Sequence, residues 1–180
     1  MASSDVNKKL EESRIITIVG GVDASYATEI IFKILSMSKE NETEDINLYF
    51  GSGGGNYLDM LAIYDTMQSV PNHFSGTCVG KNANYAVLLL AACTKGKRYA
   101  LPHSTVYFTQ PTTHLGRGAN QQTEVLIEAK ELNHERAIFE QLMAKHTGQP
   151  LEKIHADLED EMDLTAEQAK EYGIIDVILN

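Results

Sequence analysis

The chain has 180 residues, of which 43% are hydrophobic, and its formal net charge at pH 7 is −10. This length predicts a single domain, residues 1–180, with one core. The acidic balance argues against nucleic-acid partners and against anionic membranes, because both repel an acidic surface, and no apolar run approaches the roughly 20 residues that span a bilayer.

The first half of the chain predicts strands that alternate with helices. A short helix should end near Glu12, and a β-branched strand should follow at residues 15–19. Apolar residues at helical spacing predict a helix over 27–35. A second strand at 46–50 should stop at the glycine run 51–55, ahead of a helix over 58–65. We expect further strands at 74–79, 98–101 and 105–108, and a buried helix at 84–94.

The second half is dominated by one long helical pattern. Residues 119–146 predict an amphipathic helix that Gly148 caps at its C-terminus. Thr165 and Gln168 have the spacing of a capping box, so a short helix should follow and end at Gly173. Residues 174–179 should close the chain as a strand, and the alternation as a whole predicts the α/β class.

Common ligand motifs are incomplete. Cys78 and Cys93 lie in apolar surroundings and are expected to be buried, reduced thiols. His134 and Glu135 begin like a zinc-binding helix, but Ile138 stands where the second histidine is needed. The glycine run lacks the following Lys-Ser/Thr of a phosphate-binding loop. We therefore expect no metal and no cofactor.

Five segments together resemble the ClpP family, the proteolytic subunits of Clp proteases. They are VGKNANYAVLLLAA (79–92), LAIYDTMQ (61–68), KGKRYALP (95–102), KHTGQPLEKI (145–154) and AKEYGIID (169–176). The resemblance runs from about residue 14 to 179. It implies the ClpP/crotonase-type fold of stacked β-β-α units, in which the long helix projects as a handle.

The positions that match the family's catalytic triad carry other residues. The nucleophilic serine corresponds to Asn84, the histidine to Thr109 and the aspartate to Glu161. A carboxamide is a poor nucleophile, and threonine does not exchange a proton near pH 7. We therefore expect a degenerate triad without catalytic residues. The family's oxyanion hole corresponds to the backbone N–H groups of Gly55 and Tyr85, which would be vestigial.

The resemblance also implies partners. The family's ATPase-docking pocket lies between subunits, and polar residues replace apolar ones at some of its positions. Its counterparts in this chain are Asn47, Tyr49, Ser69, Thr77, Val79, Tyr99 and Leu101. The family's axial N-terminal hairpin precedes the first helix, whereas Met1 falls almost at that helix, so this hairpin is either naturally absent or has been removed from the chain. We expect active ClpP-type subunits as partners in a heptameric ring, and weak docking of a Clp-family AAA+ ATPase.

Three interpretations of function follow. The first is a non-catalytic, ClpR-type subunit (a pseudoprotease) with a structural or regulatory role in ATP-dependent proteolysis, hence not an enzyme. The second is an active serine-type endopeptidase or a weak peptidase that uses other residues. The third is a crotonase-like acyl-thioester enzyme with Gly55 and Tyr85 as oxyanion donors. The expected location is the cytoplasm, or an organelle matrix or stroma after removal of a transit peptide.

Overall fold

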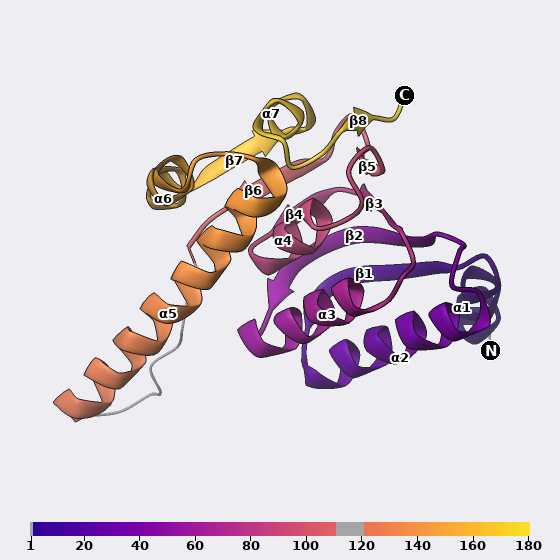
Figure 1. Cartoon of the computed structure of the whole chain (residues 1–180), viewed down its shortest axis with the longest axis horizontal. Helices are drawn as coiled ribbons and strands as arrows, with labels where there is room; N and C mark the ends of the chain where they lie inside the picture. Colours follow the sequence, from indigo (N-terminus) through magenta and orange to yellow (C-terminus); the bar gives the residue numbers. More distant parts are fainter. Residues whose placement is uncertain (1, 111–120) are drawn as a thin grey trace.

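The computed structural model describes residues 2–110 and 121–180, and its largest element in these ranges is a parallel sheet (Figure 1). The sheet has the strand order β1-β2-β3-β5-β8. Its strands are β1 (Ile15–Val22), β2 (Ile46–Gly55), β3 (Phe74–Cys78), β5 (Arg98–Ala100) and β8 (Val177–Ile178). Ile46, Leu48 and Phe50 alternate with more exposed neighbours along β2. This period of two gives the sheet one buried face.

Helices cover that buried face. Figure 1 shows α2 (Ala24–Glu40) and α3 (Tyr57–Ser69) side by side along the sheet, with α1 (Ala2–Glu12) near the start of β1. Ile30 and Ile34 of α2 are fully buried, and so is Ile63 of α3. The apolar faces that the spacing predicts therefore form the core between the helices and the sheet.

A smaller sheet stands beside the first. It has the order β4-β6-β7, formed by β4 (Lys81–Ala83), β6 (Thr105–Phe108) and β7 (Met162–Thr165). β4 pairs with β6 in parallel, and β6 pairs with β7 antiparallel. The chain passes from β4 into α4 (Tyr85–Ala91), whose residues are all buried.

The long helix α5 (Gln122–Thr147) projects from the body, and α6 (Leu151–Asp160) and α7 (Ala166–Tyr172) pack near its C-terminal end (Figure 1). Gly148 ends α5 in the left-handed conformation. Only Phe139, Glu140 and Met143 of α5 are buried, all in its C-terminal half. The predicted apolar stripe is therefore covered at one end, while Val125 at the other end is exposed.

The α/β class is confirmed, and several local predictions hold. Thr165 and Gln168 form the predicted capping box, and Gly173 caps α7. The buried cysteines Cys78 and Cys93 are free thiols, as predicted. No helix within the described ranges is both long and apolar enough to cross a membrane.

Other boundaries need correction. The glycine run 51–55 does not stop the second strand, because β2 continues to Gly55 by pairing with the end of β1. The last strand is only two residues long, and α4 is shorter than the predicted helix 84–94. The long helix begins at Gln122; residues 119 and 120, where the prediction began, lie outside the described residues. The strands β4 and β7 and the helix α6 were not predicted.

Candidate functional site

A strained turn joins β4 to α4, and Asn84 occupies it. Asn84 has φ of 51° and ψ of −133°, a positive-φ conformation that costs free energy for any residue with a Cβ. Its backbone N–H donates to the Tyr107 carbonyl oxygen at 3.4 Å, and its Nδ2 donates to the Gly53 carbonyl oxygen at 3.1 Å. The turn thus presents one side chain between the glycine run of β2 and the strand β6.

The end of β2 packs closely against this turn. Gly54 has φ of 97°, and a Cβ added to it would lie 3.0 Å from the Cβ of Asn84. The Ser52 hydroxyl accepts a hydrogen bond from the Gly54 N–H at 3.0 Å and donates to the Gly20 carbonyl at 2.6 Å. A side chain at position 54 would therefore press on the turn, which explains the need for glycine there.

The predicted oxyanion donors come from both sides of this contact. Tyr85 opens α4 directly after Asn84. Gly55 lies one residue beyond Gly54, opposite Val22 in β1. Of the two glycines, Gly54 is the one at which an added Cβ would lie against Asn84. The role of Gly55 and Tyr85 as donors stays a prediction.

A carboxylate with two hydroxyl partners forms the other half of the site. Thr109 Oγ1 donates to Glu161 Oε1 at 3.1 Å, and Tyr107 Oη donates to Glu161 Oε2 at 2.9 Å. Glu161 also has a positive φ, of 50°, at the junction of α6 and β7. The structure therefore brings Thr109 and Glu161 into contact, and the β4–β6 pairing places Ala83 beside Tyr107, so that Asn84 follows close by.

Tyr107 is a site residue that the sequence comparison missed. Its signal was present, because Tyr107 in β6 precedes Thr109, just after the end of β6, by two residues, and alternate residues of an extended segment share a face. Lys81 Nζ lies 4.3 Å from the centre of the Tyr107 ring and 3.7 Å from Asp163 Oδ2. Hydrogen bonding to Glu161 is the main cause that raises the pKa of Tyr107, so its hydroxyl stays a donor.

Aromatic rings surround the first residue of α4. Tyr85 is buried, and its ring centre lies 5.5 Å from that of Tyr57 and 5.2 Å from that of Phe139. Burial raises the pKa of Tyr85 far above its ordinary value, and the nearby Glu135 carboxylate adds to the rise. The Tyr85 hydroxyl therefore remains a neutral donor, and it has no hydrogen-bond partner within the described ranges.

The predicted docking positions lie partly in one row. Tyr49, Thr77 and Tyr99 are neighbours across β2, β3 and β5, and the row continues to Thr17 in β1 and Val177 in β8. Val79 and Leu101 are exposed just after β3 and β5, and Asn47 is half-buried two residues before Tyr49. Ser69 lies apart from this row, in the last turn of α3, where its hydroxyl donates to the Thr66 carbonyl.

A shallow groove reaches part of this surface. Of the predicted docking residues, Tyr49 and Val79 line it, beside Leu10, Ile15 and Thr17. The groove is thus shifted toward α1 and β1. The docking role of all these positions stays a prediction. Within residues 2–110 and 121–180, no cluster of three or more histidine, cysteine or acidic residues is arranged to hold a metal.

The sequence was compared with known families and proteins. A family described as Clp protease matches residues 1–180. The chain is 40% identical over 179 residues to "ATP-dependent Clp protease proteolytic subunit 1" of Bifidobacterium longum, covering 99% of this chain and 76% of the relative. It is 43% identical over 171 residues to the protein of the same name from Thermobifida fusca, covering 95% of this chain and 76% of the relative.

These relatives correct one prediction. From Asn84 and Thr109 we expected that the chain is not an enzyme, but both relatives are curated as proteolytic subunits of a protease, and the prediction is therefore wrong. Matching three positions one by one did not reveal the hydroxyl groups that the fold gathers around Glu161. The family match agrees with the ClpP-type fold and favours a peptidase over an acyl-thioester enzyme. The chain belongs to the Clp protease family.

Proposed function

We propose that this chain is a proteolytic subunit of an ATP-dependent Clp-type protease and takes part in the hydrolysis of peptide bonds. The observation that carries the proposal is the strained turn at Asn84, which is packed on Gly54 and whose N–H donates to the Tyr107 carbonyl oxygen. The Tyr107 hydroxyl in turn donates to Glu161, the partner of Thr109. In many peptidases such a turn projects the nucleophile and leaves the backbone N–H groups beside it free to act as oxyanion donors. In this chain the turn would supply such donors, and the reacting hydroxyl would come from Thr109. The names of the two relatives support the same function.

The proposed nucleophile and base are Thr109 and Glu161. A hydroxyl becomes a nucleophile when an adjacent general base takes its proton, and Thr109 Oγ1 lies within hydrogen-bond reach of Glu161 Oε1. A carboxylate is a weaker base than an imidazole, and Thr109 is only 6% exposed. Both features predict a slow peptidase rather than a fast one. Tyr107 holds the second oxygen of Glu161 and so positions the base.

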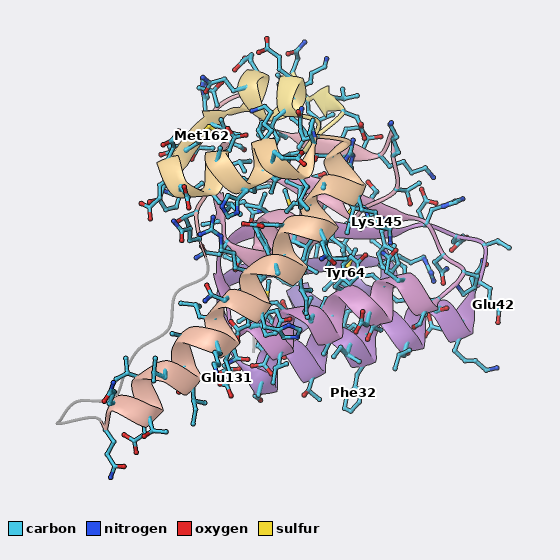
Figure 2. All side chains as sticks on the ribbon, turned by 60° about the vertical axis from the view of Figure 1, so that its left-hand side comes forward. Phe32, Glu42, Tyr64, Glu131, Lys145 and Met162 are labelled. Carbon is cyan, nitrogen blue, oxygen red and sulfur yellow. The ribbon has the colours of Figure 1, made fainter. Side chains whose placement is uncertain are left out.

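The proposed setting is a ring of ClpP-type subunits, joined by active homologues and weakly docked to a Clp-family AAA+ ATPase, in the cytoplasm or in an organelle matrix or stroma. Several large apolar side chains are exposed to solvent on the isolated chain, and burying them between subunits would stabilise an assembly. Phe32 points away from the body from α2 (Figure 2) and is 66% exposed, and Leu58 on α3 is 70% exposed. Val125, Leu126 and Ile127 are exposed together near the start of α5.

The test of chemistry is hydrolysis of a fluorogenic peptide by the purified chain, alone and mixed with a homologue whose own nucleophile has been removed. We expect slow hydrolysis that Thr109→Val abolishes and Thr109→Ser preserves. Glu161→Gln should lower the rate roughly 100-fold, the usual scale of general-base assistance. Thr28→Val is the matched control, because Thr28 is exposed on α2 and its hydroxyl bonds only within that helix.

Two results would overturn the proposal. Absence of hydrolysis in every preparation would contradict a proteolytic role, and a Thr109→Val rate equal to that of the unmodified chain would assign the activity elsewhere. Sedimentation velocity tests the assembly separately. A stable monomer at micromolar concentration, alone and with the homologue, would contradict the ring.

A further inference from the structure

The backbone of Asn84 has a second chemical consequence, independent of peptide hydrolysis. An asparagine side chain can react with the backbone nitrogen of the next residue to form a five-membered imide. The ring closes only when that nitrogen lies on the same side of the Cα–C bond as Cβ. For an L-residue this requires ψ of about −120°, as at the first central residue of a type II′ turn.

Asn84 already has this conformation. Its φ of 51° and ψ of −133° are close to the values of that turn position. Most asparagines must leave a favourable conformation to reach this geometry. At Asn84 the fold holds the strained backbone, so rotation of the side chain alone brings Cγ to the nitrogen of Tyr85.

We propose that Asn84 is a site of spontaneous deamidation in the folded protein. The Tyr85 nitrogen attacks Cγ, so a C–N bond forms while the bond from Cγ to Nδ2 breaks. Nδ2 leaves as ammonia and carries away the proton that the Tyr85 nitrogen loses. Water then opens the imide at either carbonyl, which gives aspartate or isoaspartate. In the net reaction one water molecule is consumed and one ammonia molecule is released, and no oxidant or cofactor is needed.

A single hydrogen bond to the described residues holds the carboxamide. Its Nδ2 donates to the Gly53 carbonyl oxygen at 3.1 Å. Its Oδ1 is buried and accepts no hydrogen bond from the described residues. One hydrogen bond must therefore break before the side chain rotates. Asn82 has an equivalent set of contacts, since its Nδ2 donates to the Ala86 carbonyl at 3.0 Å and its Oδ1 has no partner among the described residues, but Asn82 is fully buried whereas Asn84 is half-buried.

The products would change the site in different ways. Aspartate places a negative charge beside the Gly53 carbonyl, where the amide now donates. Isoaspartate adds a methylene to the main chain, so it lengthens the turn between β4 and α4 and must displace the residues that pack on it, Gly54 among them. Deamidation would thus alter this site with time.

The chain contains a matched control for the reaction. Asn56 is also followed by a tyrosine, Tyr57, so the reacting groups are the same. Its ψ is 141°, which keeps the Tyr57 nitrogen away from Cβ, and its side chain caps α3. Asn56 is more exposed than Asn84, so exposure alone would favour reaction at Asn56.

The experiment is incubation of the native chain in mildly alkaline buffer, followed by peptide mass spectrometry with fragmentation to assign each asparagine. We expect Asn84 to lose ammonia at least roughly tenfold faster than Asn56, equivalent to about 1.4 kcal/mol in the barrier. The Asn84→Asp chain supplies the standard for the aspartyl product. A parallel incubation in urea removes the fold, and the two asparagines should then react at similar rates.

Either of two outcomes would overturn the inference. Equal or slower reaction at Asn84 than at Asn56 in the native chain would show that the turn does not favour the imide. A native rate at Asn84 no higher than its rate in urea would show that the fold contributes nothing. Both readouts use the unmodified protein, so they do not depend on whether a variant folds or whether the chain hydrolyses peptides.

Discussion

Arg98 and Asp176, 78 residues apart in the chain, form a bidentate ion pair in which Nη2 lies 2.6 Å from Oδ1 and Nε lies 2.8 Å from Oδ2. Arg98 is only 3% exposed. Its Nη1 also donates to backbone carbonyls of Ala91, His146 and Gly173. One guanidinium therefore ties β5 to α4, to the end of α5 and to the C-terminal segment.

The Asp176→Asn variant should lower the free energy of unfolding by about 3–5 kcal/mol, because it leaves a buried guanidinium without its counter-charge. Denaturant titration measures the change. Asp163→Asn is the matched control, since its pair with Lys81 is exposed and should be worth about 0–1 kcal/mol. Equal losses in the two variants would contradict a special role for Arg98.

The Arg98–Asp176 pair also predicts that the free energy of unfolding depends on pH in acid. Burial by itself would raise the pKa of Asp176, but hydrogen bonds from Arg98 and from the Gly96 N–H outweigh it and hold the pKa below its ordinary 3.8. The unfolded chain therefore binds this proton first as the pH falls. The contribution of the ionised Asp176 to the free energy of unfolding should be full well above pH 3.8 and should decline below it. The difference in free energy of unfolding between the unmodified chain and Asp176→Asn should therefore become smaller in acid. A constant difference would contradict this assignment.

His146 predicts a second pH dependence at a higher pH. His146 Nε2 and the Tyr64 hydroxyl form a hydrogen bond of 2.9 Å. The same hydroxyl accepts a hydrogen bond from Lys145, and both side chains are labelled in Figure 2. Burial, with the charges of Lys145 and Arg98, lowers the pKa of His146 to about 4. The imidazole is therefore neutral in the folded chain at any pH well above 4.

In the unfolded chain His146 should gain a proton near its ordinary pKa of 6.5. The free energy of unfolding should thus fall by roughly 1–2 kcal/mol between pH 6.5 and pH 4, less than the full shift implies because the ring is partly exposed. His146→Gln should remove this decline, and His103→Gln, an exposed control, should keep it. The measurement is denaturant unfolding across that pH range. An unchanged slope in His146→Gln would refute the prediction.

Two neighbouring glycines should respond differently to alanine. A Cβ at Gly55 would lie 2.1 Å from the Val22 carbonyl oxygen, whereas nothing lies within 4 Å of one at Gly53. Gly55→Ala must separate β1 from β2 and should cost about 1–3 kcal/mol. Gly53→Ala should leave stability nearly unchanged. Thermal unfolding of both variants measures the difference. Similar melting temperatures would contradict the prediction, because they would mean that β1 and β2 can separate at Gly55 at little cost in free energy.

The proposed weak docking of an ATPase rests on polar groups at Asn47, Ser69 and Thr77. The triple variant Asn47→Tyr, Ser69→Phe, Thr77→Ile should tighten binding of a Clp-family ATPase to the assembled ring, since each buried apolar side chain contributes roughly 1.5–3 kcal/mol. Because Ser69 lies apart on α3, the pair Asn47→Tyr, Thr77→Ile should account for most of the gain. Unchanged affinity in both variants would remove these positions from the docking surface.

The sequence by itself determined the elements whose stabilising contacts are local. Thr165 and Gln168 bond to each other's backbone within one turn, and Gly148 needs only its own positive φ, so both helix ends could be predicted. The apolar spacing of α2 and the β-branched run of β1 likewise depend on nearby residues. The α6 segment also carries a local signal, with Leu151, Ile154 and Leu158 at helical spacing, but the acidic residues around it concealed that signal.

Only the tertiary structure decided the rest, because the contacts involved join distant segments. Lys81-Asn82-Ala83 has no intrinsic preference for a strand and becomes one by pairing with β6. The glycine run extends β2 because β1 lies beside it. At the site, the family resemblance located Asn84, Thr109 and Glu161, but the strained ψ of Asn84, the closeness of Gly54 and the second hydroxyl from Tyr107 arise where β2, β4, β6 and β7 meet. Residues brought together from distant segments show no pattern in the local sequence, so their contacts could be identified only from the folded structure.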